Sequence, residues 1–425
     1  MAGYNTPRKK ENPMKYGCIG EHLGHSFSRE IHARLADYEY ELCEIAPEAL
    51  DAFARERNFR AINVTIPYQE RIMPHLHEID EGARLIGAVN TVVNRDGLLY
   101  GYNTDFYGMC ELIRHAGVEI KDKKVAILGT GGTSKTARAV ATSLGAAEIF
   151  TVSRTARGEI IDYERLEREH RDVEVIINTT PVGMYRDFDG VPVDVSRFPT
   201  LIGVIDAVYN PLRTRLVSEA SERGVRAEGG LYMLVAQAVR ASEIFLGTTY
   251  PDGTTERIYR EMMRDKENIV LIGMPACGKS TVGALLSKDT WREVIECDER
   301  IVNHVGADIP TIFKTEGEAK FREYEAEVIR AVAQDTGKII STGGGAILNP
   351  ENIKRLRRNG KIYFIDRPLE ALMPTADRPL SSTREEIEAR YRERYGLYKS
   401  SADVTVAGDL SARKIADKIL EDFEG

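Results

Sequence analysis

Short apolar runs alternate with longer amphipathic stretches along most of the chain. In the first hundred residues, the apolar and β-branched runs read YGCIG (16–20), ELCEI (41–45), AINVTI (61–66) and GAVNTVV (87–93). Runs of this length predict buried strands, and the amphipathic segments between them predict helices. From about Lys15 onward, the pattern therefore predicts an α/β domain.

The same alternation continues through the middle of the chain. The segment KKVAILGTGG (123–132) predicts a buried parallel strand that runs into a glycine turn, and TSKTARAVATSLG (133–145) predicts the helix that follows. Further strands are expected at 149–155, 173–181 and 201–209. Repeated strand–helix units of this kind predict a doubly wound sheet.

A polar, glycine-containing segment, residues 247–268, separates this region from a second series of strands and helices. We place the boundary near Asp265. The expected strands of the second series have the same apolar composition and lie in NIVLIG (268–273), REVIECD (292–298), KIISTGGG (338–345), KIYFID (361–366) and DVTVAG (403–408). The chain is thus expected to be an α/β protein throughout.

Composition and charge narrow the classes of function. Hydrophobic residues make up 42% of the 425 positions and charged residues 29%, which is typical of a globular protein. Lys and Arg number 58 against 66 Asp and Glu, and the net charge of −8 argues against a nucleic-acid partner. No apolar run reaches the length of a membrane span, and the five scattered cysteines show no Cys-x-x-Cys pair. We therefore expect a cytoplasmic protein without membrane or nucleic-acid partners.

The stretch GMPACGKS (273–280) matches the phosphate-loop pattern G-x-x-x-x-G-K-[ST] between an apolar strand and a helix-forming run. The glycines let backbone N–H groups turn toward phosphate oxygens, while Lys279 supplies a charge and Ser280 a hydroxyl for Mg²⁺. The motif predicts ATP or GTP binding. The expected nucleotide contacts are Gly273, Ala276, Cys277, Gly278, Lys279, Ser280 and Thr281.

Polar and glycine-rich segments follow the later strands of the second series. They read VIECDERI (294–301), FREYE (321–325), STGGGA (341–346), ADRPLS (376–381) and RYGLYKSSADVTV (394–406). Strand ends of an open α/β sheet form its ligand crevice, so several of these segments should meet at one pocket. Arginine suits bidentate recognition of a carboxylate.

In these motifs and their order, residues 268–425 resemble shikimate kinase, which implies an ATP-dependent phosphorylation of shikimate. By that resemblance, Asp298 binds the ring hydroxyls near the attacking oxygen, and Arg378 from the lid contacts the transferring phosphoryl group. The implied carboxylate and ring contacts are Arg322, Arg394, Gly343, Gly344 and Gly345.

Two positions depart from the kinase pattern. The family usually has Asp-x-Asp where this chain has Glu296, Cys297 and Asp298, so Glu296 and Ser280 are the expected Mg²⁺ contacts. The lid between Asp366 and Arg378 is short and has no counterpart of the arginine that stacks on adenine. Closure over ATP is expected to be less complete.

In the first half, the glycine turn LGTGGTSKTA (128–137) contains Gly129, Gly131 and Gly132, as expected of a dinucleotide-binding loop. An NAD site has an acidic residue at the end of the next strand, where this chain has Ser153, Arg154, Thr155 and, close by, Arg157. A cation there suits a 2′-phosphate, so NADP(H) is favoured over NAD.

Motifs spread over residues 15–250 resemble shikimate dehydrogenase, in that family's order. They read EHLGHSFS (21–28), AINVTIPYQE (61–70), IGAVNT (86–91), GYNTDF (101–106), INTTPVGM (177–184), IDAVYNP (205–211) and GLYMLVAQA (230–238). The implied substrate contacts are Ser26, Ser28, Thr65, Asn90, Asp105, Tyr209 and Gln237, and the implied cofactor contacts add Thr133, Gly183 and Met184. Hydroxyl and amide side chains are also what a polyhydroxylated ring acid requires.

The largest departure in this half is Gln69, which stands where the family has a lysine that works with the aspartate in proton transfer. An amide donates a hydrogen bond but does not titrate, and losing a positioned acid or base costs about 10²- to 10⁴-fold. Three accounts stay open: Asp105 carries the proton, with a water, His75 or His77; the half only binds ligands as a regulatory module; or Gln69 is an introduced change.

Together the resemblances imply a bifunctional enzyme with four segments. These are a substrate domain at 14–105 completed by 237–252, an NADP-binding domain at 106–236, a linker at 253–266 and a kinase domain at 267–425. The first half would reduce 3-dehydroshikimate with NADPH, and the second would phosphorylate the resulting shikimate with ATP and Mg²⁺. The expected catalytic residues are Asp105, Gln69, Lys279, Asp298 and Arg378.

Overall fold

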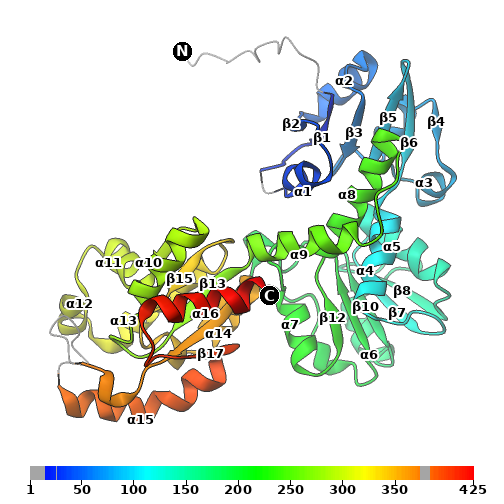
Figure 1. Ribbon diagram of the computed structural model, residues 1–425. Coiled ribbons are helices and arrows are strands. Elements are labelled where there is room, and N and C mark those ends of the chain that lie inside the picture. The colour runs from blue at the N-terminus through cyan, green and yellow to red at the C-terminus, as the bar shows by residue number, and fades with distance from the viewer. Residues whose placement is uncertain (1–14, 25, 374–382) are drawn as a thin grey trace, which may run out of the picture. The chain divides into compact units, whose positions relative to one another are not determined.

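The computed structural model describes residues 15–24, 26–373 and 383–425 (Figure 1). The described chain divides into two compact units. The first comprises the residues up to Asn210 together with Thr214–Arg260, and the second comprises Pro211–Arg213 and Glu261–Gly425. Among the helices of these ranges, none has both the length and the apolar composition needed to cross a membrane.

The first sheet of unit 1 is mixed. Its strand order is β2-β1-β3-β5-β6-β4, with β5 antiparallel to both β3 and β6. Its strands are β1 (Tyr16–Gly20), β2 (Tyr40–Glu44), β3 (Ala61–Val64), β4 (Glu78–Ile79), β5 (Thr91–Arg95) and β6 (Leu98–Tyr102). The helices of this region are α1 (Ser28–Leu35), α2 (Leu50–Glu56), α3 (Glu81–Ile86) and α8 (Leu231–Leu246). Helix α8 comes from much later in the chain, and its Ala241 and Phe245 pack into a core with residues of this first sheet.

The second sheet of unit 1 is parallel throughout, in the order β12-β11-β10-β7-β8-β9. Its strands are β7 (Lys124–Leu128), β8 (Glu148–Ser153), β9 (Ile161–Asp162), β10 (Val175–Asn178), β11 (Gly203–Asp206) and β12 (Arg226–Glu228). The accompanying helices are α4 (Asp105–His115), α5 (Gly132–Ser143), α6 (Tyr163–Glu169) and α7 (Arg215–Glu222). The predicted doubly wound sheet is confirmed.

Strand β7 shows why this sheet is covered on both faces. Side chains alternate along a strand, and Val125 and Ile127 pack into a core with residues of α4, α5 and α8, including Met109 and Val140. Ala126 and Leu128 lie in the opposite core with α6 and α7. A strand buried on both faces has the continuous apolar sequence that predicted it.

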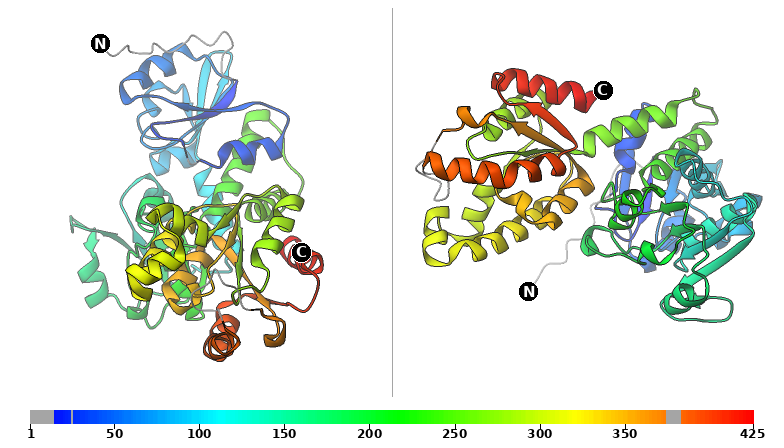
Figure 2. Two further views of the ribbon diagram at one scale, coloured as in Figure 1. Left: turned by 90° about the vertical axis from the view of Figure 1, so that its left-hand side faces the viewer. Right: turned by 90° about the horizontal axis from the view of Figure 1, so that it is seen from below.

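Unit 2 is built on one parallel sheet in the order β14-β15-β13-β16-β17. Its strands are β13 (Asn268–Ile272), β14 (Val294–Glu296), β15 (Ile339–Ser341), β16 (Gly360–Asp366) and β17 (Val404–Ala407). Its helices are α10 (Lys279–Thr290), α11 (Cys297–Val305), α12 (Ile309–Thr315), α13 (Gly317–Val332), α14 (Pro350–Asn359), α15 (Arg384–Ser401) and α16 (Ala412–Glu424). All five strands predicted for the second series are confirmed, and Figure 2 shows helices on both faces of this sheet.

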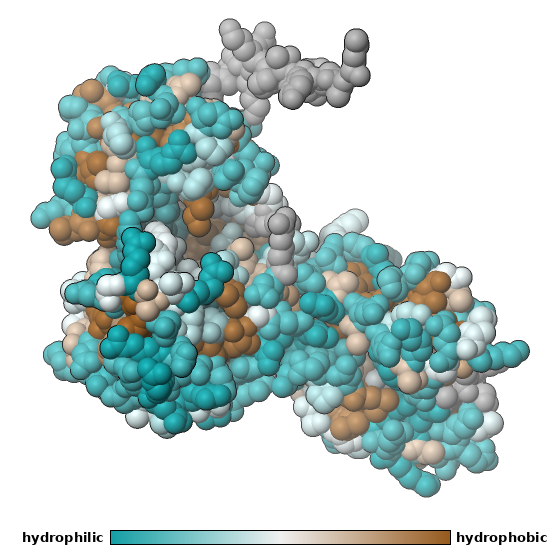
Figure 3. Space-filling model, turned by 180° about the vertical axis from the view of Figure 1, so that it is seen from behind, coloured by the Kyte–Doolittle hydropathy of each residue, from teal (hydrophilic) through white to brown (hydrophobic). Residues whose placement is uncertain are grey.

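The segment proposed as a linker is mostly helical: helix α9 (Thr254–Lys266) contributes residues to both units. The face of the protein in Figure 3 is largely hydrophilic, with scattered hydrophobic patches. This distribution agrees with a charged fraction of 29% and with cores that lie on the sheet faces.

Candidate active sites

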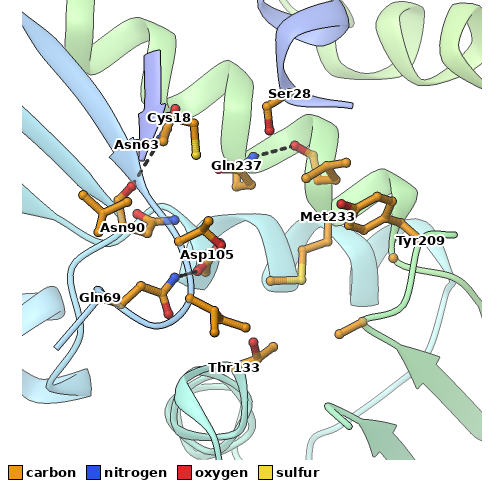
Figure 4. A pocket seen from close by; sticks show the side chains of 16 residues that line it. Cys18, Ser28, Asn63, Gln69, Asn90, Asp105, Thr133, Tyr209, Met233 and Gln237 are labelled. Carbon is orange, nitrogen blue, oxygen red and sulfur yellow. Dashed lines mark hydrogen bonds between the residues drawn. The ribbon is translucent and has the colours of Figure 1, made fainter. Parts of the chain in front are cut away.

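Unit 1 contains a polar cavity of about 180 Å³ where residues of both of its sheets converge (Figure 4). Seven residues predicted to act on the substrate line it: Ser28, Thr65, Gln69, Asn90, Asp105, Tyr209 and Gln237. The remaining lining residues are Cys18, Asn63, Val64, Ile66, Thr133, Ala207, Gly230, Met233 and Leu234. The structure therefore gathers into one cavity residues that are up to 219 positions apart in the chain, Cys18 and Gln237.

Asp105 and Gln69 form a direct pair within this cavity. Asp105 opens helix α4, and Gln69 Nε2 donates a hydrogen bond of 3.3 Å to Asp105 Oδ2. Burial raises the pKa of Asp105 to about 6, and the hydrogen bonds from Asn90 and Gln69 offset only part of that effect. Asp105 can thus hold or release a proton near neutral pH, whereas its amide partner cannot titrate.

The Gln69 side chain also lies against the glycine turn of the second sheet. A Cβ atom on Gly132 would come within 2.9 Å of Gln69 Oε1. The amide nitrogen faces Asp105, so the oxygen is the atom turned toward Gly132. Gln69 therefore bridges the carboxylate of the cavity and the turn predicted to bind the cofactor.

A hydrogen-bond network fixes the amide side chains at the cavity wall. Asn90 Oδ1 accepts from the backbone N–H of Thr104 at 2.8 Å, and Asn90 Nδ2 donates to Thr104 Oγ1 at 3.1 Å. Asn63 Oδ1 accepts from Tyr40 Oη at 2.7 Å, and Asn63 Nδ2 donates to Thr91 Oγ1 at 3.2 Å. Both amides are buried, so the cavity presents polar groups in set orientations.

The other predicted contacts come from separate elements. Ser28 begins α1, and Ser26, which does not line the cavity, donates to Ser28 Oγ at 3.1 Å. Gln237 projects from α8, where its Nε2 donates to the carbonyl of Leu234 at 2.8 Å. Tyr209 follows β11 and packs its ring against Phe27 at a centroid distance of 5.4 Å. Ser26 thus supports the site through a neighbour.

A buried carboxylate that the sequence reasoning missed orders the loop carrying Tyr209. Asp206 has no exposed surface and accepts hydrogen bonds from Thr214 Oγ1 at 2.7 Å, Asn178 Nδ2 at 2.9 Å and the backbone N–H of Val208 at 3.0 Å. Burial raises its pKa to about 6. The sequence does contain a signal for this role: Asp206 ends an apolar strand, and a charged residue is rarely buried at such a position without hydrogen-bond partners.

Neither histidine considered as a proton carrier lines the cavity. His75 Nε2 lies 3.1 Å from Asp51 Oδ1, and the ring of His77 packs edge-on against Tyr100. Eight residues that line the cavity were not predicted: Cys18, Asn63, Val64, Ile66, Ala207, Gly230, Met233 and Leu234. Cys18 and Asn63 lie in predicted strands, and only the strand register shows which of their side chains face the cavity.

The residues expected to bind NADP(H) lie at the carboxyl ends of adjacent parallel strands. The glycine turn follows β7, Ser153 ends β8, and Gly183 follows β10, with β7 between the other two in the sheet. Gly129 has φ +114°, and a Cβ there would lie 2.7 Å from Thr179 Oγ1. Only glycine fits at this position, as expected of a turn that lets the backbone approach a pyrophosphate.

Around that turn, the remaining predicted cofactor contacts are accessible. Arg154 and Arg157 are exposed after β8, as is Thr155, and Met184 is exposed by 46%. Thr133, in the first turn of α5, reaches the polar cavity. Residues predicted for cofactor and substrate therefore meet at Thr133.

In unit 2, the phosphate loop joins β13 to α10. Gly273 has φ +153° and Gly278 has φ +104°, and Gly278 caps the N-terminus of α10. Lys279 Nζ donates to the carbonyls of Gly273 at 2.9 Å and Met274 at 3.1 Å. Ser280 and Thr281 are exposed at the start of the helix. A helix N-terminus framed by glycines and a lysine fits a triphosphate.

The glycine turn after β15 is the centre of the second site. A Cβ on Gly343 would lie 2.7 Å from Asp298 Oδ1 and 2.8 Å from Glu325 Oε1, and one on Gly344 would lie 2.8 Å from Pro275 Cδ in the phosphate loop. A Cβ on Gly345 would overlap the guanidinium of Arg322. Three side chains and the phosphate loop are thus so close to this turn that only glycine fits at its three positions.

Two arginines predicted to bind a carboxylate converge on this turn. Arg394 is 4% exposed, and its Nη1 donates to the carbonyl of Gly344 at 3.2 Å. Arg322 Nη1 donates to the buried carboxylate of Glu325 at 2.8 Å. Burial raises the pKa of Glu325, and the Arg322 charge opposes that rise. A cavity of about 300 Å³ opens beside Asp298, lined also by Glu299, Val302, Asn303 and Ile309.

The residues expected to hold Mg²⁺ lie at or after the carboxyl ends of two strands of the same sheet. Ser280 follows β13 and Glu296 ends β14, which are separated in the sheet by β15. Within the described ranges, no cluster of three or more His, Cys, Asp or Glu side chains could hold a metal. One hydroxyl and one carboxylate fit a cation that takes its other ligands from water and phosphate oxygens. The predicted lid residue Arg378 lies outside the described residues.

Two family models match separate parts of the chain. The model described as shikimate dehydrogenase substrate binding domain matches residues 18–92. The model described as shikimate kinase matches residues 275–424.

Similar proteins and structures cover the first part. A protein from Clostridium perfringens named shikimate dehydrogenase (NADP(+)) is 36% identical over 265 residues, which are 58% of this chain and 97% of that protein. A chorismate mutase/shikimate 5-dehydrogenase fusion protein from Clostridium acetobutylicum is 35% identical with a TM-score of 0.55, covering 59% and 97% of the two chains. Shikimate 5-dehydrogenase from Thermus thermophilus, solved with NADP(H) and shikimate, is 30% identical with a TM-score of 0.53, covering 58% and 99%.

Proposed function

The chain belongs to the shikimate dehydrogenase family and carries a shikimate kinase domain, and from this premise we propose that it performs two consecutive reactions on one ring acid. The first is the NADPH-dependent reduction of 3-dehydroshikimate to shikimate, and the second is the ATP-dependent phosphorylation of shikimate. The main support is that in each unit polar side chains lie directly beside a glycine turn with the spacing expected of a phosphate-binding turn. Gln69 and Thr133 join the two in unit 1, and Gly344 against Pro275 joins them in unit 2.

In the first reaction, bound NADPH supplies a hydride to the ketone carbon. We assign the matching proton to Asp105, which donates it to the ketone oxygen in reduction and receives it back in oxidation. A pKa of about 6 places both protonation states within reach of neutral pH. Gln69 Nε2 has a second N–H for the ketone oxygen while it holds Asp105 in place. The assignment favours an active dehydrogenase over a binding module, the second candidate.

The neutral side chains of the cavity orient the ring. Ser28, Thr65, Asn90, Tyr209 and Gln237 offer hydroxyl and amide groups, supported from outside by Ser26. Each buried hydroxyl of the substrate needs a partner, and a preset network lowers the cost of providing it. We propose that Arg154 and Arg157 select the 2′-phosphate of NADP(H), together with Ser153 and Thr155.

In the second reaction, ATP with Mg²⁺ supplies the phosphoryl group. We propose that Asp298 orients the acceptor hydroxyl, that Arg322 and Arg394 bind the carboxylate, and that Gly343–Gly345 let the ring approach the backbone. Lys279 provides the charge that stabilises the transferring group, and Ser280 and Glu296 would hold Mg²⁺. Catalysis by positioning and charge neutralisation is what this arrangement can deliver.

We further propose that small molecules are the only ligands of both sites and that the enzyme works in the cytoplasm, the compartment that supplies NADPH and ATP. A net charge of −8 supports the absence of a nucleic-acid partner.

One preparation of the full chain tests the proposal. Shikimate with NADP⁺ should produce NADPH absorbance, and shikimate with ATP and Mg²⁺ should release ADP. An ADP signal without NADP⁺ reduction would instead support the hypothesis that the first half only binds ligands. Loss of both signals in a folded protein would reject both proposed reactions.

A further inference from the structure

Helix α15 carries Arg390 on the face that meets the glycine turn after β15, Gly343–Gly345. Arg390, Arg394 and Tyr398 are spaced by four residues, so they lie on one side of the helix. Arg394 Nη1 and Tyr398 Oη both donate to the carbonyl of Gly344, at 3.2 and 2.5 Å. Arg390 continues this row by one turn.

Three guanidinium groups in this region each have a buried nitrogen with no hydrogen-bond partner among the described residues. These atoms are Arg322 Nε, Arg390 Nη1 and Arg394 Nε. Buried donors in folded proteins almost always find an acceptor, and charged donors have the strongest need of one. Three unsatisfied donors around one site indicate a ligand that brings acceptor oxygens.

The like charges of neighbouring arginines also favour an anion. Arg394 acts as a like-charge neighbour of Arg390, and Arg394 and Arg322 both lie at the Gly343–Gly345 turn. A ligand carboxylate between these guanidinium groups would reduce their mutual repulsion.

The outer carboxylates near Arg390 have other roles. Glu318 binds Arg322 at 3.0 Å, Glu386 accepts from the backbone N–H of Thr383 at 3.2 Å, and Glu393, whose side chain is 58% exposed, lies 3.8 Å from Arg394 Nε, beyond hydrogen-bond distance. No carboxylate within the described ranges forms a salt bridge with Arg390. Burial, followed by the charge of Arg394, lowers the pKa of Arg390. An anion placed beside Arg390 would relieve both effects.

We infer that Arg390 is a third guanidinium of the acceptor site of unit 2, which binds the carboxylate of the ring acid together with Arg322 and Arg394. The inference rests on the proposed kinase reaction and deepens it. Three guanidinium groups around one carboxylate would make this site selective for the ionised acid over neutral ring alcohols or esters.

The test compares shikimate with its methyl ester in the kinase reaction of the full chain, before and after Arg390→Met. With shikimate, the substitution should raise KM about tenfold to a hundredfold while kcat stays within about threefold. The ester lacks the charge that Arg390 binds. With the ester as substrate, Arg390→Met should therefore lower kcat/KM by about threefold or less. Equal losses for acid and ester would overturn the inference.

Matched variants separate binding from folding. Arg392→Met removes a 79% exposed arginine two residues along the same helix and should leave both substrates unaffected. Arg390→Lys keeps the charge without the planar fork and should recover part of the lost affinity. If Arg390→Met does not fold, Arg390→Gln takes its place in the same comparison. A wild-type chain that phosphorylates neither substrate would refute the kinase proposal itself, a result distinct from equal losses in an active enzyme.

Discussion

The two sites that we propose for one ring acid differ in the charges of their side chains. Among the described residues that line the cavity of unit 1, Asp105 is the only one charged at neutral pH, and the others are hydroxyl, amide or apolar groups. The site of unit 2 is assembled from arginines, the buried carboxylate of Glu325 and the partly buried carboxylate of Asp298. Ketone reduction needs a proton donor at the ketone oxygen, the role proposed for Asp105. Phosphoryl transfer instead needs cations, because negative charge must be neutralised.

The strongest way to break this comparison is to remove the one charge of the first cavity. Asp105→Asn should lower the rate of shikimate-dependent NADP⁺ reduction by about 10²- to 10⁴-fold, because the proton carrier is lost. ADP release by unit 2 should be unchanged, and both rates can be measured on the same preparation. A dehydrogenase rate within threefold of the wild type would show that another group transfers the proton.

Removing the charge of the substrate should affect the two sites unequally. With the methyl ester of shikimate, kcat/KM of the kinase should fall by about a hundredfold, since charge-assisted hydrogen bonds are roughly twice as strong as neutral ones. For the dehydrogenase we expect about tenfold, measured as NADP⁺ reduction. Equal losses in the two assays would contradict the distinction between neutral and ionic recognition.

Replacing Gln69 by a titratable lysine tests the role of Gln69. Gln69→Lys should increase the rate of shikimate oxidation about tenfold or more, because the lysine adds a proton-transfer group beside Asp105. A lysine also favours ionised Asp105, so the pKa of Asp105 should fall.

The pH profile measures that shift directly. Oxidation needs ionised Asp105, so kcat/KM of the wild type should rise tenfold per pH unit up to about 6 and then level off, and reduction should show the reverse. In Gln69→Lys, the pH at which the profile levels off should be lower. If neither the rate nor this pH changes, Gln69 does not act on Asp105.

A smaller effect concerns the phosphate loop. Ala276 has φ +61°, a left-handed conformation that costs an L-residue roughly 1–2 kcal/mol and glycine almost nothing. Ala276→Gly should therefore stabilise unit 2 by up to about 1 kcal/mol, once the greater flexibility of unfolded glycine is subtracted. Thermal denaturation with and without ATP checks this, and a destabilised variant would show that the loop is not strained there.

The sequence predicted the strands of the two parallel sheets well, because a strand covered on both faces is a continuous apolar run, as in Val125–Leu128. It was less informative where the sheet is mixed: the β5–β6 hairpin, turning at Asp96 and Gly97, was not predicted. The glycine turns were found because phosphate binding requires glycine at fixed spacing.

Side-chain direction limited the prediction of the sites. Asn63 lies in a predicted strand, yet only its register shows that it faces the cavity. Arg390 lies in the charged run RYRER (390–394), which has the composition of an exposed helix face, and only the fold shows that its Nη1 atom is buried. The pairing of Gln69 with Asp105 came from family resemblance, because no local pattern links positions 36 residues apart.

Counting bound shikimate tests the central claim most directly. Calorimetric titration of the full chain should give two equivalents of shikimate per chain. Asn90→Ala should remove one equivalent and Arg322→Met the other. Two equivalents in the wild type, each lost with its own substitution, is the predicted result; one equivalent or none, or a count that neither substitution changes, would contradict two sites for one ring acid.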